Sequence, residues 1–460
     1  MSVSPFKTLL PTVAYGSIEN GGSLSLADDR NLLGVSAPTD RVTVISNLLN
    51  ALLGVGLFTI PWGFQMSGIV AGTVILCVVA CGSAETVRIL LISQQQLFQA
   101  TGDIMGYSEM AAEAVGPVWG EVVKIATVIS CMGGCCGYVI FFGQTLGQAF
   151  DLPADNVIYI LAIPLVLLSW IRSFKELTVA TVFGVAATML TVIILIKDGS
   201  QYSHGPEPIP LALPHTMMHF AGSATFLFTI HYCALSIGEE WLKTGLRVRR
   251  ASVVSCDETR AQEASNNDMF SELSSSIAMS YVAAGVLIYT VGYFGYTSYR
   301  DVDLVRDKYG DVVGGCEQPV CQNVILNISP GIFRNIVGIA MSLVIGLSYL
   351  VILAPAREHI EAQVLAWLQP SNDLKQALIE KVLRTSLVLL TVTVAIKAPY
   401  FGNVLGSVGG LTDAFLCFVL PPLIYRSLME DQLSPLANAF YIGVTCVGVG
   451  IICYTLLSFL

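Results

Sequence analysis

The chain has 460 residues, of which 54% are hydrophobic and only 12% are charged, and its mean hydropathy is +0.69. Soluble domains carry about twice that charged fraction, so this composition excludes an ordinary soluble globular protein. Apolar stretches long enough to cross a bilayer recur along almost the whole chain, which predicts an all-α integral membrane protein. The net charge of −10, without a basic stripe, gives no reason to expect a nucleic-acid partner.

Residues 1–40 are polar and rich in Ser and Gly, which predicts a disordered cytosolic tail. Residues 41–460 read as one transmembrane domain with eleven spans. A hinge, WIRSFKE (170–176), separates the fourth span from the fifth, and a polar linker at 242–275 follows the sixth. The expected spans are 42–63, 69–93, 121–147, 155–171, 176–197, 216–241, 276–298, 332–356, 379–398, 403–427 and 436–459.

Basic residues predict the orientation, because loops rich in Lys and Arg stay in the cytoplasm. With a cytosolic amino terminus, 17 of the 23 Lys and Arg fall on the cytoplasmic side. Four of the other six lie in the long loop 299–331, and long loops translocate largely regardless of charge. The carboxyl terminus is therefore expected to be extracellular or lumenal. No sorting signal distinguishes the plasma membrane from a vacuolar or lysosomal-type membrane.

The loop 299–331 carries further signals. Cys316 and Cys321 lie in GGCEQPVCQN, and the sequon NIS follows at Asn327. On an extracellular or lumenal face the two thiols could form a disulfide and Asn327 could carry a glycan. Two free thiols are the alternative.

The first span contains NALLGVGLFTIP, Asn50 to Pro61. Gly54 and Gly56 each weaken a helix by about 1 kcal/mol relative to alanine, and proline by about 3 kcal/mol. A broken span is tolerated in a bilayer where the unwound backbone lines a cavity. Its free amides suit a carboxylate and its free carbonyls suit a cation, so the site fits a zwitterion. The alternative is a glycine-lined packing face.

The sixth span, HFAGSATFLFTIHYCALSIGEEW, carries a polar interruption at the corresponding place. Gly222, Thr225 and Thr229 are small or polar residues within it, and His231 lies in mid-span. An intramembrane histidine is a candidate proton carrier, but a neutral histidine bonded to a neighbour would have a structural role alone.

These segments together resemble the amino acid/auxin permease family of the amino acid–polyamine–cation superfamily. The first span has its pattern of Asn, Gly-x-Gly and then Pro. GVLIYTVGYFGYTSY (285–299), LAPAREHI (353–360) and GSVGGLTDAFLCFVLPPLIY (406–425) are similar to its seventh, eighth and tenth spans. The resemblance runs from about 41 to 459. It implies a LeuT-like fold with broken helices 1 and 6, in which 41–197 and 216–427 are inverted repeats and 436–459 is an extra helix.

The resemblance also implies site residues. Backbone of the first span would hold the substrate carboxylate, backbone of the sixth would take the α-amino group, and an aromatic residue of the third would close over the substrate. The positions for substrate are Leu53, Gly54, Val55, Gly56, Tyr138, Thr225, Phe226 and Thr229.

The sequence leaves the identity of the coupling ion open. Asn50 and Ser348 match the sodium positions of the family, but Gly346 lacks a hydroxyl, and proton-coupled members also carry the asparagine. His231 would serve a proton. Ile230 stands where many relatives have glycine, which changes the pocket.

The resulting hypothesis is secondary-active amino acid transport by alternating access, a symport with H⁺ or Na⁺. A membrane sensor that binds amino acids without accumulating them is the alternative. An enzyme is not expected, because neither HExxH nor a Walker loop occurs. No cofactor is expected beyond the coupling ion, the partners are the amino acid and the lipid bilayer, and one chain should form the transport unit.

Overall fold

The computed structural model describes residues 41–170, 177–202, 208–214, 216–252, 258–306, 310–430 and 432–459. These residues form helices and connecting loops, and their only β-type pairing is an isolated bridge between Arg306 and Val312. The tail 1–40 and most of the hinge 170–176 lie outside the described residues.

Helices occupy all eleven ranges where spans are predicted. Among the residues that the structure describes, eight helical segments are long and apolar enough to cross a membrane, and Ala154–Ser169 is a shorter apolar helix. The helices, in order, are α2 (Arg41–Leu52), η1 (Val55–Thr59), α3 (Ile60–Ser67), α4 (Ile69–Thr101), α5 (Tyr107–Ala114), α6 (Pro117–Phe150), α7 (Ala154–Ser169), α8 (Leu177–Gly199), α9 (Met217–Phe228), α10 (His231–Ser252), α11 (Glu258–Tyr299), η2 (Val324–Asn327), α12 (Ile332–Leu368), α13 (Asp373–Lys397), α14 (Phe401–Val408), η3 (Gly409–Asp413), η4 (Phe415–Val419), α15 (Leu420–Leu428) and α16 (Pro435–Leu457).

Several helices extend beyond the predicted spans. The polar linker predicted at 242–275 is helical over most of its length, because α10 continues to Ser252 and α11 begins at Glu258. Hydropathy marks only the part of a helix that lies in lipid, whereas Glu, Gln, Arg and Ala continue a helix into water. The short helix α5 was not predicted.

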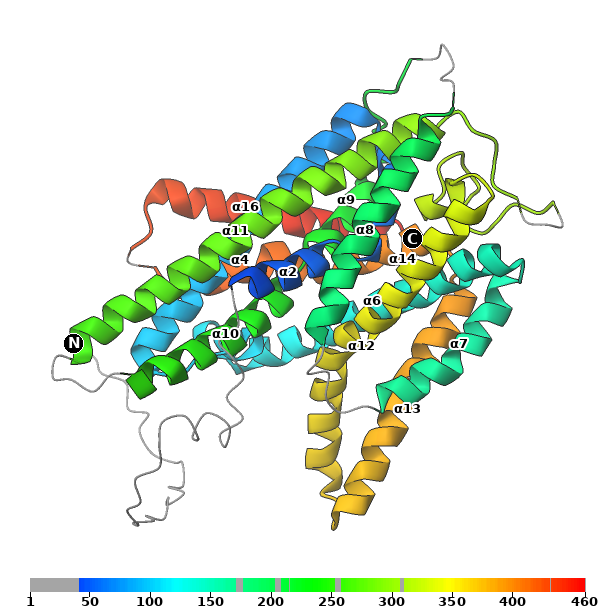
Figure 1. Ribbon diagram of the computed structural model, residues 1–460. Helices are drawn as coiled ribbons and strands as arrows, with labels where there is room; N and C mark the ends of the chain where they lie inside the picture. Colours follow the sequence, from blue (N-terminus) through cyan, green and yellow to red (C-terminus); the bar gives the residue numbers. More distant parts are fainter. Residues whose placement is uncertain are drawn as a thin grey trace. The chain divides into compact units, whose positions relative to one another are not determined.

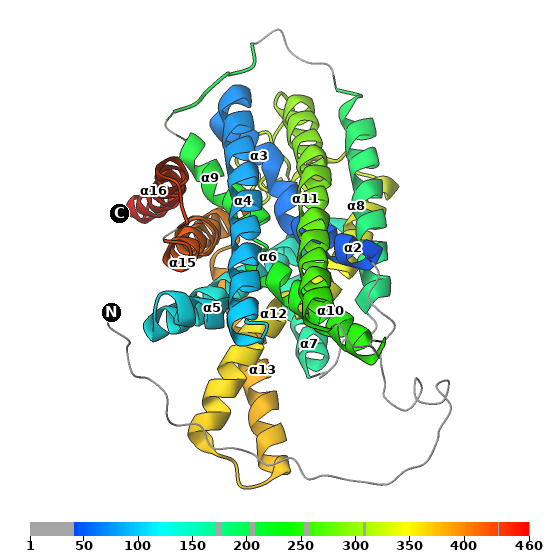
Figure 2. The same ribbon diagram turned by 90° about the vertical axis from the view of Figure 1, so that its left-hand side faces the viewer.

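Helix α6 lies at the centre of the bundle, where it contacts α5, α7, α12, α13 and α14. Residues 134–145 of α6 are all buried, and the stretch around 131–143 is rich in glycine and cysteine; small residues let membrane helices pack closely. Around it, α4 and α11 run side by side (Figure 2). Helix α4 contacts α9, and α11 contacts η1. The two interrupted helices therefore lie between a central helix and an outer pair.

Helices α12 and α13 form a hairpin that extends past the other labelled helices in both ribbon views (Figures 1 and 2). Arg384 fixes this hairpin: its Nε lies 2.6 Å from Glu361 Oε1 and its Nη1 donates to the carbonyl of Trp170 at 3.2 Å. Glu380 lies 3.5 Å from the same guanidinium. The ion cluster joins α12 and α13 to the end of α7.

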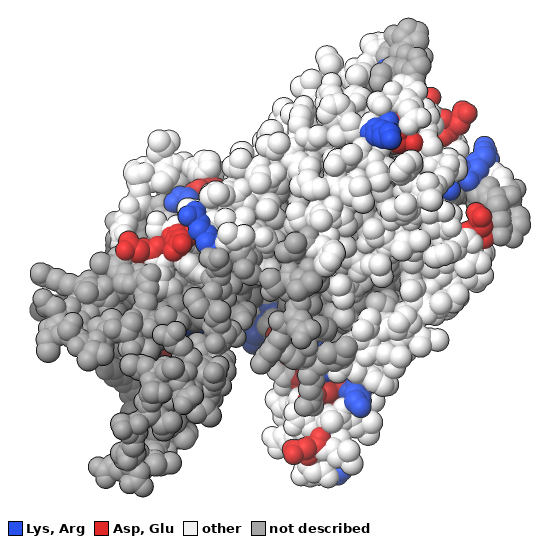
Figure 3. All heavy atoms as spheres, viewed as in Figure 1, with Lys and Arg blue, Asp and Glu red and all other residues white. Residues whose placement is uncertain are grey.

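Charged side chains gather toward the ends of the helices on the face shown in Figure 3, and the described surface between them is uncharged. Many large apolar side chains of the described residues are exposed, including Phe183 on α8 and Val282 and Val286 on α11. Exposed apolar surface of this extent is expected of a protein that faces lipid.

Candidate functional site

The first predicted break is present. Helix α2 ends at Leu52, Gly54 adopts an extended conformation with ψ −173°, and a short 3₁₀ segment, η1, leads into α3. Pro61 occupies the first turn of α3, where its missing amide costs no intrahelical bond. The chain thus leaves α2 with free carbonyls at its end and enters η1 with free amides at its start. At the start of α3 the amide of Ile60 already donates to the carbonyl of Leu57, and Pro61 has no amide.

The second break lies between α9 and α10, at Thr229 and Ile230. The carbonyl of Phe228 is stabilised there by two hydroxyls, Ser83 Oγ at 2.6 Å and Tyr281 Oη at 3.0 Å. The amide of Ile230 donates to the same oxygen. Buried backbone groups freed by a break need such partners. Ser83 on α4 and Tyr281 on α11 therefore hold the break open.

The two breaks face each other. A Cβ placed on Gly56 would lie 3.1 Å from Leu227 Cδ1 and 3.4 Å from Phe226 Cδ1. A Cβ placed on Gly54 would lie 3.5 Å from the hydroxyl of Tyr138, which is 3% exposed on α6. The structure thus brings together Gly54, Gly56, Tyr138 and Phe226, which the resemblance had assigned to substrate.

The hydroxyls of Thr225 and Thr229 point along their own helix. Thr225 Oγ1 donates to the carbonyl of Ala221 at 2.8 Å, and Thr229 Oγ1 donates to the carbonyl of Thr225 at 2.7 Å. Such bonds to a carbonyl one turn earlier are common for Ser and Thr in helices. The side-chain hydroxyls of these two residues are therefore already engaged within the helix, and their part in binding a substrate stays a prediction.

His231 is fully buried at the start of α10. Its Nε2 lies 2.8 Å from Thr86 Oγ1, which also bonds the carbonyls of Gly82 and Ser83. Its Nδ1 has no hydrogen-bond partner among the residues that the structure describes. A charged imidazolium needs an acceptor at both nitrogens, so this environment suits a neutral ring.

Of the two predicted sodium residues, Asn50 lies against α8. A Cβ on Gly184 would lie 2.5 Å from Asn50 Oδ1 and 3.2 Å from Val344 Cγ1. Val344 is one turn before Ser348, whose hydroxyl donates to the Val344 carbonyl at 3.1 Å. Gly184 thus allows α2 and α12 to converge, and Ser348 lies one turn along α12 from this junction.

A feature that the sequence analysis did not find follows α14. The chain forms two successive π-helical segments, η3 and η4. π-helices are rare, short and frequent at functional sites. Asp413, at the end of η3, is 1% exposed and accepts a hydrogen bond of 2.5 Å from Ser130 Oγ on α6. The signal in the sequence was an aspartate inside an apolar span.

Tyr107 on α5 stabilises the same region from outside the spans. Its hydroxyl donates to the carbonyl of Leu416 at 2.6 Å, inside η4. Burial raises the pKa of this hydroxyl well above its usual range, so it stays a donor.

The loop 299–331 folds against the ends of the helices. Cys316 and Cys321 form a disulfide, and both are fully buried. Asn327 is 4% exposed; its Oδ1 accepts from the amide of Cys321 and its Nδ2 donates to the carbonyl of Pro319 at 2.7 Å. A glycan on Nδ2 requires this loop to open, and glycosylation stays a prediction.

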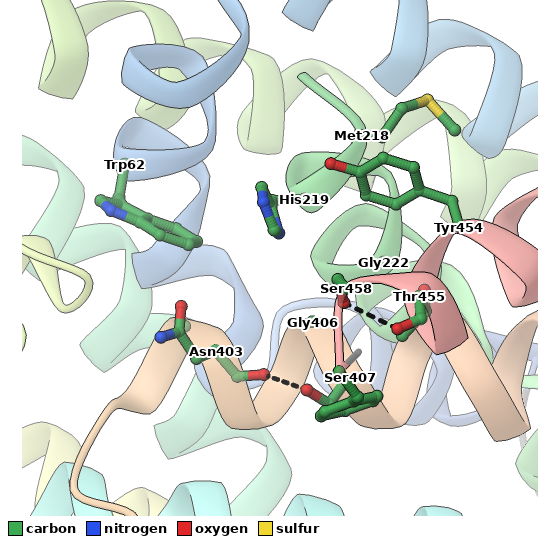
Figure 4. A pocket seen from close by; sticks show the side chains of 12 residues that line it. Trp62, Met218, His219, Gly222, Asn403, Gly406, Ser407, Tyr454, Thr455 and Ser458 are labelled. Atoms are coloured by element: carbon green, nitrogen blue, oxygen red, sulfur yellow. Dashed lines mark hydrogen bonds between the residues drawn. The ribbon is translucent and has the colours of Figure 1, made fainter. Parts of the chain in front are cut away.

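An open pocket of about 190 Å³ lies between α3, α9, α14 and the end of α16. Figure 4 shows Trp62, His219 and Tyr454 on one side of it and Asn403 and Ser407 of α14 on the other. None of the residues at the two breaks lines this pocket. It is therefore separate from the site predicted for substrate.

Facing breaks in two membrane-length helices are typical of membrane transporters that bind solute between half-helices. The chain belongs to the transmembrane amino acid transporter protein family, whose model matches residues 38–243 and 261–459. The resemblance to amino acid/auxin permeases is thereby confirmed. Members of this family are transporters, not enzymes.

The chain is also similar to two named relatives and to one solved structure. It is 21% identical to amino acid transporter AVT3B of Arabidopsis thaliana, covering 92% of this chain and 94% of that protein. It is also 21% identical to solute carrier family 38 member 10 of Rattus norvegicus, where 92% of this chain spans only 36% of the relative. A mutant of the Eremococcus coleocola manganese transporter superposes with TM-score 0.50 at 12% identity, covering 95% and 99% of the two chains, and so shares the fold.

Proposed function

We propose that the chain is a secondary-active transporter that moves amino acids across a membrane by alternating access, coupled to an H⁺ or Na⁺ gradient. The observation that carries this proposal is the facing pair of breaks: Gly56 lies against Phe226 and Leu227, and Tyr138 lies against Gly54. The family and the name of the Arabidopsis relative support amino acids as the solute.

The chemistry of the breaks explains why an amino acid would bind there. The amides at the start of η1 carry partial positive charge and attract a carboxylate. The carbonyls at the end of α9 carry partial negative charge and attract an ammonium. A zwitterion satisfies both ends at once, and the amino acid side chain then meets Phe226 and Tyr138.

The proposed architecture has eleven spans in two inverted repeats of five, followed by α16. The first repeat would contain α2 to α8 and the second α9 to α15, so that the breaks in α2–α3 and α9–α10 correspond. The proposed orientation places the amino terminus in the cytosol, which is supported by the distribution of Lys and Arg.

Uptake into proteoliposomes tests the proposal. The purified full chain is reconstituted and screened with each of the twenty radiolabelled amino acids under an imposed sodium gradient, an imposed pH gradient or neither. Accumulation above equilibrium under one gradient supports transport and identifies the ion. Binding without gradient-driven accumulation or exchange would instead indicate the sensor.

A further inference from the structure

Asp413 is a buried carboxyl without a cation. It is 1% exposed inside a membrane-length helical segment, and it forms no ion pair with any Lys, Arg or His that the structure describes. A carboxylate in such a place is costly unless it is paired or takes up a proton. Ionisable groups inside the membrane are functional candidates for this reason.

The surroundings of Asp413 can serve both of its charge states. Ser130 Oγ donates to Asp413 Oδ1 at 2.5 Å, which stabilises the carboxylate. Tyr232 lies near both Ser130 and Asp413. Because a hydroxyl oxygen also accepts hydrogen bonds, the same Ser130 oxygen can take the proton of a neutral carboxyl.

The other groups around Asp413 carry no positive charge. The titratable groups that face it are Cys131 on α6, Tyr232 on α10 and Cys417 on η4. The sides of η3 turned to α9 and α16 meet Phe226 and Thr455, which do not titrate. Asp413 therefore dominates the charge of this cluster.

The cluster touches the break that the proposed function requires. Tyr232 is the second residue of α10, two residues after Ile230 in the break. Ser130 lies on the central helix α6, and Asp413 ends a π-helical segment packed against α9. A change of charge on Asp413 would thus act on Tyr232 at the start of α10 and on α9, the two half-helices that flank the break.

From this geometry we propose that Asp413 is the proton-binding site that couples the pH gradient to transport. This rests on the proposed function. A proton from the more acidic side forms an O–H bond on one carboxylate oxygen, which changes the side chain from −1 to neutral. That bond breaks on release to the other side, and the carboxylate is restored.

His231 is a second candidate proton carrier near this break, and its contacts fit the role less well. Protonation would put a hydrogen on Nδ1, which has no acceptor among the described residues. A buried unpaired donor on a charged ring is costly. Asp413 has partners for both states, whereas His231 has them for one.

The test compares Asp413→Asn with the control Asp103→Asn, an exposed carboxylate after α4. Full-length proteins are reconstituted with the pH dye pyranine inside, and the amino acid that the wild type exchanges fastest is added outside. Wild type and Asp103→Asn should acidify the vesicles during uptake and should accumulate the amino acid under an inside-alkaline gradient. Asp413→Asn should lose both responses while it still exchanges labelled for unlabelled amino acid.

Ser130→Ala provides a second measurement. Loss of the donor to the carboxylate should move the midpoint of the pH dependence upward by about one pH unit. Proton-coupled accumulation by Asp413→Asn, or an unmoved midpoint in Ser130→Ala, overturns the role of Asp413. If Asp413→Asn does not reach the membrane, the midpoints of the pH dependence of Asp413→Glu and Ser130→Ala decide the question.

The wild type separates this proposal from the proposed function. Accumulation driven by sodium alone overturns the Asp413 proposal but keeps the proposed function. Absence of both exchange and accumulation overturns the proposed function.

Discussion

Gly56 has no side chain at the point where η1 faces the end of α9. Replacing it with Leu would put four carbon atoms into a space where even a Cβ meets Leu227 Cδ1 at 3.1 Å. We expect Gly56→Leu to abolish amino acid uptake, because the two breaks could no longer approach each other around a substrate. Uptake into cells, with surface biotinylation to measure the amount in the membrane, checks this.

The matched control is Gly285→Leu on α11, where a Cβ would meet nothing within 4 Å. That variant should transport normally. Normal transport by Gly56→Leu would place the substrate site elsewhere.

Ser348 tests the sodium alternative at the same scale. Its hydroxyl lies one turn along α12 from Val344, which is at the junction of α2, α8 and α12. If sodium is the coupling ion, Ser348→Ala should weaken its apparent affinity by about tenfold, the scale of one interaction with a charged group. Ser386→Ala is the control, because Ser386 makes the same bond to a carbonyl four residues earlier on the exposed face of α13. An identical sodium titration in both variants removes Ser348 from the ion site.

At the scale of elements, the break between α9 and α10 depends on hydroxyls from other helices. Tyr281→Phe deletes one donor to the Phe228 carbonyl and should lower the free energy of unfolding by about 1 kcal/mol. Ser83→Ala should do the same, and because Ser83 Oγ and Tyr281 Oη are 2.8 Å apart, the double variant should not be additive.

Melting curves in detergent measure these effects. Tyr159→Phe serves as control, since Tyr159 is 59% exposed on α7. Full additivity of the two changes would show that the hydroxyls act independently.

The elements differ in how far sequence predicts them. The first break follows from local backbone preferences, because Gly54, Gly56 and Pro61 weaken a helix wherever they occur. The π-helical segments do not, because they depend on packing: a Cβ at Gly409 would overlap the carbonyl of Gly222, and one at Gly410 would overlap Thr455. The partner of Asp413 is 283 residues away, which no local pattern reveals. Residue types therefore predicted the spans and the first break, whereas long-range contacts defined the remainder of the site.

At the scale of the whole transmembrane unit, the loop 299–331 connects elements that would separate under the proposed alternating access, when this side of the protein opens. Gln65 on α3 bonds Gln318 and accepts from the amide of Val320. Gln322 accepts from the amide of Gly402, at the start of α14. Together these bonds join α3 to α14 across the loop.

Gln65→Ala removes two of these bonds, each worth about 1 kcal/mol, and should speed opening on this side by more than about tenfold. Hydrogen–deuterium exchange over 314–327 should rise accordingly. Gln363→Ala, an exposed glutamine on α12, should leave it unchanged. Equal exchange in the two variants would show that the loop does not hold α3.

The hairpin of α12 and α13 has a practical consequence. Helix α12 has 37 residues, which corresponds to about 55 Å, whereas the hydrocarbon core of a bilayer is about 30 Å thick. The Arg384 cluster makes the two helices rigid where they leave the bundle. Membrane proteins of this size lack features that align particle images in electron cryomicroscopy. A soluble helical protein fused in register to this hairpin would supply a fiducial mark without touching either break.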